Sequence, residues 1–241
     1  MAHAIPQIEL PESLAEHLKT FSTFFPDKVR FDEDTHSVEI TETLPFELRV
    51  SMSYLKIVTD IQDVMENLEL VLSDLAAIAT YPPANAREGE RRYFLLTKLF
   101  FYELLRIRDA FPRFLKRMEE DGLMSKDGRH ASRKLIDEQL SEHYLIRNVY
   151  LHGHSFPRSD AEFDLSLISM ASECGYEPKL VPLNGDDPKE YPHVLQSLAT
   201  KRREGLIKIA SDMVAFCQSI INTTAIWVSH HHFPGESASE T

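Results

Sequence analysis

Apolar residues recur at steps of three and four from Ser53 onward, which is the period of an amphipathic α-helix. The first such stripe comprises Val58, Ile61, Met65, Leu68, Leu72, Leu75 and Ala79. The segment YPPAN that follows ends this helix, because proline cannot donate the next backbone hydrogen bond. The pattern therefore predicts a first long helix over residues 53–79.

Two more long helices are predicted after it. The second runs from Ala86 to about Glu120, and its middle, YFLLTKLFFYELLRI, is apolar nearly all round, as in a helix at the centre of a bundle. We expect Pro112 to kink or split this helix. The third runs from about Ala131 to Leu151 and stops at Gly153, a residue suited to the left-handed conformation that ends many helices.

The remaining chain is predicted to form shorter elements and one further long helix. AEFDLSLISMAS favours a short helix, residues 175–192 a long loop rich in Pro and Gly, and residues 193–228 a last helix. Upstream, PESLAEHLKTFSTFF favours a short amphipathic helix, and VRFDEDTHSVEIT favours two short strands around a polar turn.

These elements predict an all-α fold, an antiparallel helical bundle with a small N-terminal β-hairpin and a long loop before the last helix. We expect an N-terminal extension over residues 1–52, a bundle over residues 53–228 and a polar tail over residues 229–241. Since a lone hairpin is marginal in water, the extension should pack on the bundle.

Composition indicates the cellular compartment of the protein. Hydrophobic residues make up 43% of the chain and charged residues 27%, as in a soluble globular protein. We see no signal peptide and no uncharged apolar run of the ~18 residues that span a bilayer, so we expect a cytoplasmic protein without membrane contact. Cys174 and Cys217 have no metal or redox spacing and are expected to be structural thiols in a reducing compartment.

Charge is unevenly distributed along the chain. The formal net charge of −12 argues against a protein coated in nucleic acid. Residues 86–134, however, contain 13 Lys and Arg residues against 8 Asp and Glu residues. Such a basic segment permits a local anionic ligand, although charges on long helices commonly just face solvent.

The most informative stretch is YLIRNVYLHGHS at residues 144–155, where polar residues interrupt the end of an apolar helix. On a regular helix the side chains of Arg147 and His152 lie about 140° apart, whereas Asn148 and His152 share a face. Arg147 and His152 can therefore act together only if the helix ends near His152, as Gly153 suggests, or if a second subunit contributes.

Arginine, asparagine and histidine together suit chemistry at a phosphodiester. Arginine is a permanent cation whose planar fork grips phosphate oxygens, and histidine exchanges protons near neutral pH. In RNA the 2′-hydroxyl is itself the nucleophile, so no metal ligand is required. The alternative is structural: Arg147 stabilises the helix C-terminus by roughly 0.3–1 kcal/mol, and His152 and His154 are half-exposed polar residues at a helix end.

The segment RNVYLHGH resembles the signature of the HEPN superfamily, compact helical bundles named for higher eukaryotes and prokaryotes nucleotide-binding. That motif is an arginine, a polar residue that is often asparagine, a few further residues and a histidine at the end of a long bundle helix. Arg147, Asn148, His152 and Gly153 match it in order and spacing. Two long helices before the motif and a short helix after it also match, so the resemblance covers residues 53–228.

The resemblance implies a metal-independent endoribonuclease without a cofactor, as in toxin, phage-defence and RNA-processing members. In those members, two copies of the motif face each other across one composite cleft of a homodimer. Carried over, Arg147 positions the scissile phosphate and stabilises its developing charge, His152 transfers protons and Asn148 supports the cleft. The expected products are a 2′,3′-cyclic phosphate and a 5′-hydroxyl, and the expected partners are RNA and an antitoxin or nucleotidyltransferase.

Further residues are candidates for contacting the substrate. Several toxin-type members have a tyrosine at the position of His154, so inferences that depend on that tyrosine do not apply to this chain. Glu103 and Arg106 belong to a charged patch on an otherwise apolar helix. They form either a structural network, since buried charges must be paired, or part of the cleft that contains Arg147.

Other sites are disfavoured. EDTH at Glu33–His36 and EYPH at Glu190–His193 have the spacing of carboxylate-bridged metal sites, but the first is in a polar turn and the second contains proline. No metal site is therefore expected, and SHHHF at 229–233 is assigned to the polar tail. Two alternatives to RNA cleavage remain: a HEPN-like bundle that binds nucleotide or RNA without cutting it, and a dimeric scaffold for a protein partner.

Overall fold

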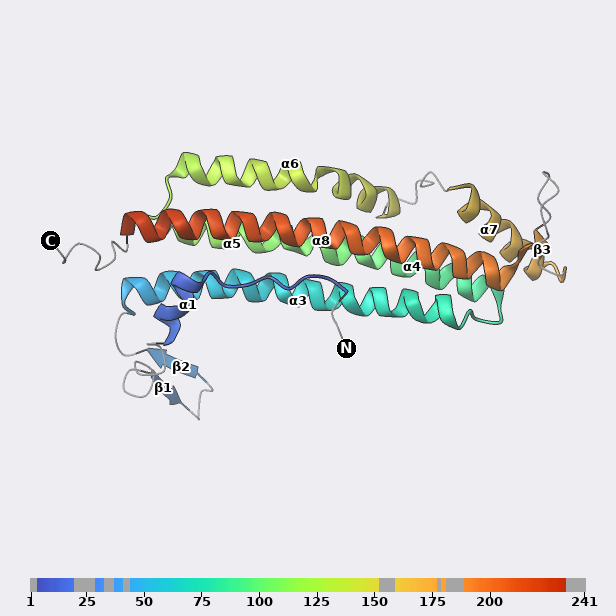
Figure 1. Ribbon diagram of the computed structural model, residues 1–241, viewed down its shortest axis with the longest axis horizontal. Coiled ribbons are helices and arrows are strands. Elements are labelled where there is room, and N and C mark those ends of the chain that lie inside the picture. The colour runs from blue at the N-terminus through green and yellow to red at the C-terminus, as the bar shows by residue number, and fades with distance from the viewer. Residues whose placement is uncertain are drawn as a thin grey trace. The chain divides into compact units, whose positions relative to one another are not determined.

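The computed structural model describes residues 4–19, 29–32, 37–40, 44–151, 159–176, 179–180 and 189–232 (Figure 1). Its helices are α1 (Glu12–Lys19), α3 (Phe46–Thr80), α4 (Ala86–Leu104), α5 (Arg106–Glu120), α6 (Lys126–Leu151), α7 (Asp160–Glu173) and α8 (Tyr191–His232). The prediction of a mainly helical fold is therefore confirmed. No helix in this part of the chain is long and apolar enough to cross a bilayer.

Two pairs of short antiparallel strands accompany the helices. β1 (Val29–Asp32) pairs with β2 (Ser37–Ile40), with Val29 opposite Ile40. β3 (Lys179–Leu180) pairs with β4 (Lys189–Glu190). The first pair lies where the sequence predicts strands, whereas the second lies within the stretch predicted to be a loop.

The chain divides into two compact units. The first unit contains Met1–Pro6, Asp63–Ile107 and Asp137–Met213, and the second unit contains Gln7–Gln62, Arg108–Ile136 and Val214–Thr241. Helices α3, α6 and α8 each contribute residues to both units. The boundaries predicted after residues 52 and 228 both fall inside helices, because α3 begins at Phe46 and α8 continues to His232.

The interior of the first unit is built around the apolar stripe that the sequence predicts on α3. Its fully buried members here are Leu68, Leu72 and Leu75. They share one side of the helix because residues three and four apart are neighbours on its surface. Facing helices contribute Phe100 and Leu104 of α4, Leu165 of α7, and Leu195, Ala199 and Leu206 of α8, all buried.

The second unit has its own apolar interior. The first half of α3 buries Tyr54, Ile57 and Ile61, and α5 buries Phe111 and Phe114. The rings of Tyr54 and Phe114 meet edge to face with centroids 5.0 Å apart, a favourable arrangement of aromatic quadrupoles. Helix α8 adds Cys217, Ile221 and Ala225 to this interior.

Glutamine side chains of α3 and α8 form hydrogen bonds with the backbone of the extended segment before α1. Gln218 of α8 accepts a hydrogen bond from the Glu9 amide at 2.8 Å and donates one to the Glu9 carbonyl at 3.0 Å. Gln62 of α3 donates to the Ile8 carbonyl at 3.1 Å. Because a glutamine amide is both donor and acceptor, Gln218 alone satisfies both backbone groups of Glu9.

The second predicted helix is split, but not where the sequence suggests. The interruption lies at Leu105, between α4 and α5, and Pro112 lies inside α5. Of the two expectations for Pro112, the split is wrong in its position, and the kink stays a prediction. With the break at Leu105, Pro112 falls in the second turn of a new helix, where it removes a single interior hydrogen bond, the one to the Arg108 carbonyl.

Candidate functional site

The last turns of α6 carry the first two residues of the predicted motif. Arg147 and Asn148 are both half-buried, and Leu151 is the last described residue of α6. The rest of the motif, His152, Gly153 and His154, lies outside the described residues. The arginine and the asparagine thus lie in the last described turns of α6.

Two tyrosine rings hold the guanidinium group of Arg147. Its Cζ atom lies 5.3 Å from the ring centroid of Tyr102 on α4 and 5.5 Å from that of Tyr144 on α6. Attraction to a ring face acts on the positive charge and uses none of the N–H donors. In the described part of the chain no carboxylate pairs with Arg147. The group therefore keeps its charge and its donors for an anion.

His143 is a neighbour of Arg147 that the motif-based prediction missed. It lies four residues earlier, on the same side of α6, and its ring centroid is 6.2 Å from that of Phe101. Burial lowers the pKa of its imidazole, and the charge of Glu142 opposes part of that shift. Its Nδ1 is buried without a hydrogen-bond partner among the described residues. The spacing of four in the sequence is the signal that points to it.

Glu103 and Arg106 form an ion pair with each other. Oε2 of Glu103 lies 2.7 Å from Nη1 of Arg106 and accepts a hydrogen bond of 3.2 Å from the Asn67 amide. Among the described contacts, neither residue reaches Arg147, although Tyr102, which precedes Glu103, does. This geometry favours the structural network over the substrate-binding role for the pair.

Exposed apolar side chains lie on the same side of α4 as Tyr102. Leu95 is 62% exposed and Leu99 is 41% exposed, and both occur at helical spacing from Tyr102. Nζ of Lys98 lies 5.9 Å from the centroid of the Tyr102 ring. The surface beside Arg147 therefore combines cations, an aromatic ring and unburied leucines.

Buried carboxylates form a separate polar cluster in the first unit. Glu90 accepts a hydrogen bond of 2.7 Å from the Ser166 hydroxyl, and Glu162 accepts one of 2.9 Å from the Tyr93 hydroxyl. Arg202 of α8 forms an ion pair with Glu162. Since each of these carboxylates has partners, the cluster is typical of a structural network rather than a reactive site.

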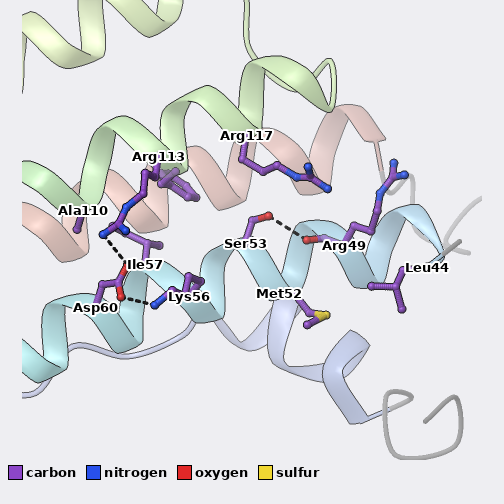
Figure 2. A pocket seen from close by; sticks show the side chains of 11 residues that line it. Leu44, Arg49, Met52, Ser53, Lys56, Ile57, Asp60, Ala110, Arg113 and Arg117 are labelled. Atoms are coloured by element: carbon purple, nitrogen blue, oxygen red, sulfur yellow. Dashed lines mark hydrogen bonds and ion pairs between the residues drawn. The ribbon is translucent and has the colours of Figure 1, made fainter. Parts of the chain in front are cut away.

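The second unit contains a pocket of about 340 Å³ between the first half of α3 and α5 (Figure 2). Its apolar lining comes from Leu44, Met52, Ile57, Ala110 and Phe114. Its cations are Arg49 and Lys56 of α3 and Arg113 and Arg117 of α5. Figure 2 shows the side chain of Arg113 reaching from α5 to Asp60 on α3. Motif-based reasoning missed this pocket, because its two segments are far apart in the sequence and share no short motif.

Metal chemistry has no support in the described residues, where no group of three or more His, Cys, Asp or Glu side chains could hold an ion. Of the two Glu-x-x-His segments, Glu33–His36 lies outside the described residues, and Glu190 and His193 are both exposed. No protein-family model, curated protein or solved structure matches the chain. The side chains around Arg147 and in the pocket are therefore the basis for inferring function.

Proposed function

We propose that the chain is a metal-independent endoribonuclease built on a HEPN-like helical bundle and active as a homodimer. The observation that carries this proposal is the state of Arg147, a cation at the end of a long helix. Two tyrosine rings hold it, and no carboxylate of the described chain neutralises it. A positive charge kept available in this way suits the binding of a phosphodiester.

The proposed reaction uses the RNA as its own nucleophile. The 2′-hydroxyl oxygen attacks the adjacent phosphorus, and the bond between phosphorus and the 5′-oxygen breaks. His152 of one copy takes the proton from the 2′-hydroxyl, and the same histidine of a second copy gives a proton to the departing 5′-oxygen. The products are a 2′,3′-cyclic phosphate and a 5′-hydroxyl, which balances atoms and protons without a metal or cofactor.

Arg147 and Asn148 have supporting roles in this reaction. Arg147 binds the non-bridging phosphate oxygens and stabilises the negative charge that builds up on them. Asn148 precedes His152 by four residues and supports the cleft. His154 follows as a contact to the RNA.

The exposed leucines beside Tyr102 support assembly with a second copy. Leu95 and Leu99 leave apolar surface in water on the side of α4 that reaches Arg147. Burial of that surface by a second copy is favourable and brings a second motif close to the first. Toxin–antitoxin or phage-defence activity, with an antitoxin or nucleotidyltransferase partner, is the setting that the HEPN resemblance suggests.

A second candidate is a HEPN-like module that binds RNA or nucleotide without cutting it. The specific observation in its favour is the ring of Tyr102, which has both Arg147 and Lys98 close to it. Cations next to an aromatic ring are common in proteins that bind single-stranded nucleic acid through its backbone and bases. This candidate needs Arg147 but not the proton transfer by His152.

Cleavage of a labelled single-stranded RNA in excess EDTA tests the proposal. We expect the wild-type chain to cleave, and Arg147→Ala and His152→Ala each to lower the rate by about 100-fold or more. Arg92→Ala is the matched arginine control, because Arg92 is exposed and already lies 3.7 Å from Glu88. His130→Ala, at an exposed histidine of α6, is the histidine control. Both controls should cleave at the wild-type rate.

The outcomes separate the candidates. Cleavage that leaves a 2′,3′-cyclic phosphate and is lost in both test variants supports the nuclease. Binding without cleavage, weakened by Arg147→Ala alone, supports the binding module. The absence of both RNA binding and RNA cleavage supports a protein-interaction scaffold. Cleavage that EDTA abolishes contradicts the metal-independent reaction.

A further inference from the structure

We propose that the pocket between α3 and α5 binds a small phosphate monoester that carries an apolar group. The pocket belongs to the second unit, whereas Arg147 belongs to the first. The proposal therefore goes beyond the proposed ribonuclease activity and does not depend on it.

The cations that line the pocket outnumber the carboxylates that they contact. Asp60 is shared by two cations, since its carboxylate lies 2.5 Å from Nζ of Lys56 and 3.8 Å from the Arg113 guanidinium (Figure 2). One carboxylate neutralises one of the two charges. This half of the pocket therefore keeps an excess of one positive charge.

The other pair of cations repeats this arrangement. Asp121 lies 3.7 Å from the Arg49 guanidinium and 3.2 Å from that of Arg117. Glu120 also approaches Arg117, at 3.8 Å, but it lies nearer to Lys116, at 3.4 Å, and this additional pair leaves the balance unchanged. The four cations of the pocket thus exceed their carboxylates by two charges. A phosphate monoester carries about −1.5 to −2 at neutral pH and matches that excess.

Hydrogen-bond donors are available for such a group. Nε of Arg49 is buried and has no acceptor among the described residues. The side chain of Arg113 is 75% exposed, and its only described carboxylate contact, to Asp60, is 3.8 Å long. Arginine donors in a planar fork suit the several oxygens of a terminal phosphate.

Most of the remaining lining of the pocket is apolar. Met52, Ile57 and Phe114 present hydrocarbon and ring surface to the pocket, and the Ser53 hydroxyl is already bonded to the Arg49 carbonyl at 3.0 Å. Inorganic phosphate would leave this surface in water, whereas an attached apolar group would cover it. A volume of about 340 Å³ is within the range of small-molecule pockets.

Two sources supply this chemistry: an isoprenyl or alkyl monophosphate, whose hydrocarbon is apolar throughout, and a nucleoside monophosphate, whose base presents a flat aromatic face. Isothermal titration calorimetry on the full chain compares adenosine 5′-monophosphate and geranyl monophosphate with inorganic phosphate, adenosine and geraniol. We expect at least one monoester to bind about 10-fold or more tightly than both inorganic phosphate and its own alcohol. If neither monoester binds, or if inorganic phosphate binds as tightly as the better monoester, the proposal is wrong.

Matched variants locate the site. Arg113→Gln should weaken binding of the monoester by about 10-fold, while Arg92→Gln should leave it unchanged. The two arginines are comparable, because Arg92 is 56% exposed and lies 3.7 Å from Glu88. Ala110→Leu, which fills the pocket, should weaken binding of the monoester and should not strengthen binding of inorganic phosphate. Equal losses in Arg113→Gln and Arg92→Gln overturn the assignment even if Ala110→Leu does not fold.

A final probe separates a small ligand from RNA. An oligoribonucleotide without terminal phosphates should not compete for the pocket at the concentrations at which the monoester binds. Competition by this oligonucleotide, lost in Arg113→Gln, would replace the monoester with an RNA backbone as occupant. Failure of the calorimetry and failure of RNA cleavage are independent results, because the test positions Arg113 and Ala110 lie in the second unit, whereas Arg147 lies in the first.

Discussion

The guanidinium group of Arg202 on α8 forms an ion pair with the carboxylate of Glu162 on α7 in the interior of the first unit. The Tyr93 hydroxyl donates a hydrogen bond of 2.9 Å to the same carboxylate. Glu162 also closes the capping box of α7, because it accepts a hydrogen bond of 3.0 Å from the Ser159 amide. One buried side chain therefore joins α4, α7 and α8 and begins a helix.

Substitution of Glu162 should destabilise the protein. In Glu162→Gln, Arg202 loses its counter-charge, and breaking a buried ion pair on one side costs about 3–5 kcal/mol. We expect urea denaturation to show that the free energy of unfolding falls by about 2 kcal/mol. The loss is smaller than that range because a quarter of the Arg202 side chain is exposed. The control is Glu173→Gln, which removes an ion pair of 3.2 Å with Arg87 that is half exposed and should cost about 0.5 kcal/mol or less. Equal effects would contradict this account.

The same carboxylate predicts how stability depends on pH. Burial by itself would raise the pKa of Glu162, but the Ser159 backbone and the charge and hydrogen bonds of Arg202 and Tyr93 outweigh it and lower the pKa below 4.5. A carboxyl with a lowered pKa stabilises the folded state above its unfolded pKa, and this contribution is lost as the pH falls through the folded pKa. The free energy of unfolding should therefore decrease as the pH is lowered past about 4.5. The decrease should be less steep in Glu162→Gln. Parallel pH profiles would show that Glu162 does not titrate as described.

Gly89 of α4 should not tolerate a side chain, because a Cβ atom there would lie 1.8 Å from Oη of Tyr191 and 2.8 Å from Cδ2 of Leu195. Alanine in a helix gains about 0.5–1 kcal/mol over glycine, but overpacking costs about 1–3 kcal/mol. We expect Gly89→Ala to lower the free energy of unfolding by about 1 kcal/mol, and Tyr191→Phe to recover part of the loss. Gly205→Ala on α8 is the control, since its Cβ meets no atom within 4 Å and the substitution should stabilise.

The two cysteines should differ in reactivity. Burial raises the pKa of the Cys217 thiol to about 12, whereas Cys174 is exposed. Because the thiolate is the nucleophile, Ellman's reagent at pH 8 should modify one thiol rapidly in the native chain and a second only in denaturant. Cys174→Ser should abolish the rapid phase. Two rapid thiols in the native protein would contradict the burial of Cys217.

Helical periodicity predicted the main elements because burial of one face dominates their stability. The stripe through Leu68 and Leu75 on α3 is buried as expected. The break at Leu105 was not predictable, since leucine favours a helix and no glycine or proline marks this position. The start of α3 at Phe46 was missed because its apolar residues alternate with polar ones, a period that is typical of strands. The end of α8 was missed because its last residues, SHHH, are polar and lack an apolar stripe.

The candidate sites were predicted only in part. The sequence identified Arg147 and Asn148 through a local motif, and both lie on α6. It did not identify Tyr102, because contacts between helices leave no short-range signal. The pocket with Arg113 and Asp60 was missed for the same reason. The basic segment over residues 86–134 gave the one hint, since it contains Arg113 and Arg117.

The contact between Tyr102 and Arg147 should affect RNA binding through the ring and not through the hydroxyl. Cation–π attraction at a half-exposed site is worth about 0.5–1 kcal/mol and arises from the ring face, which phenylalanine retains. We expect Tyr102→Leu to weaken the binding of a labelled single-stranded RNA about 2- to 5-fold in fluorescence anisotropy, and Tyr102→Phe to bind like wild type.

A control and a double variant make this prediction specific. Tyr81→Leu replaces a tyrosine that is 81% exposed and should leave RNA affinity unchanged. If Tyr102 acts by holding the guanidinium, Tyr102→Leu should have little further effect in an Arg147→Ala background, because the partner is already absent. Additive losses in the double variant would instead mean that the ring of Tyr102 contacts the RNA directly, and that Arg147 does not depend on it.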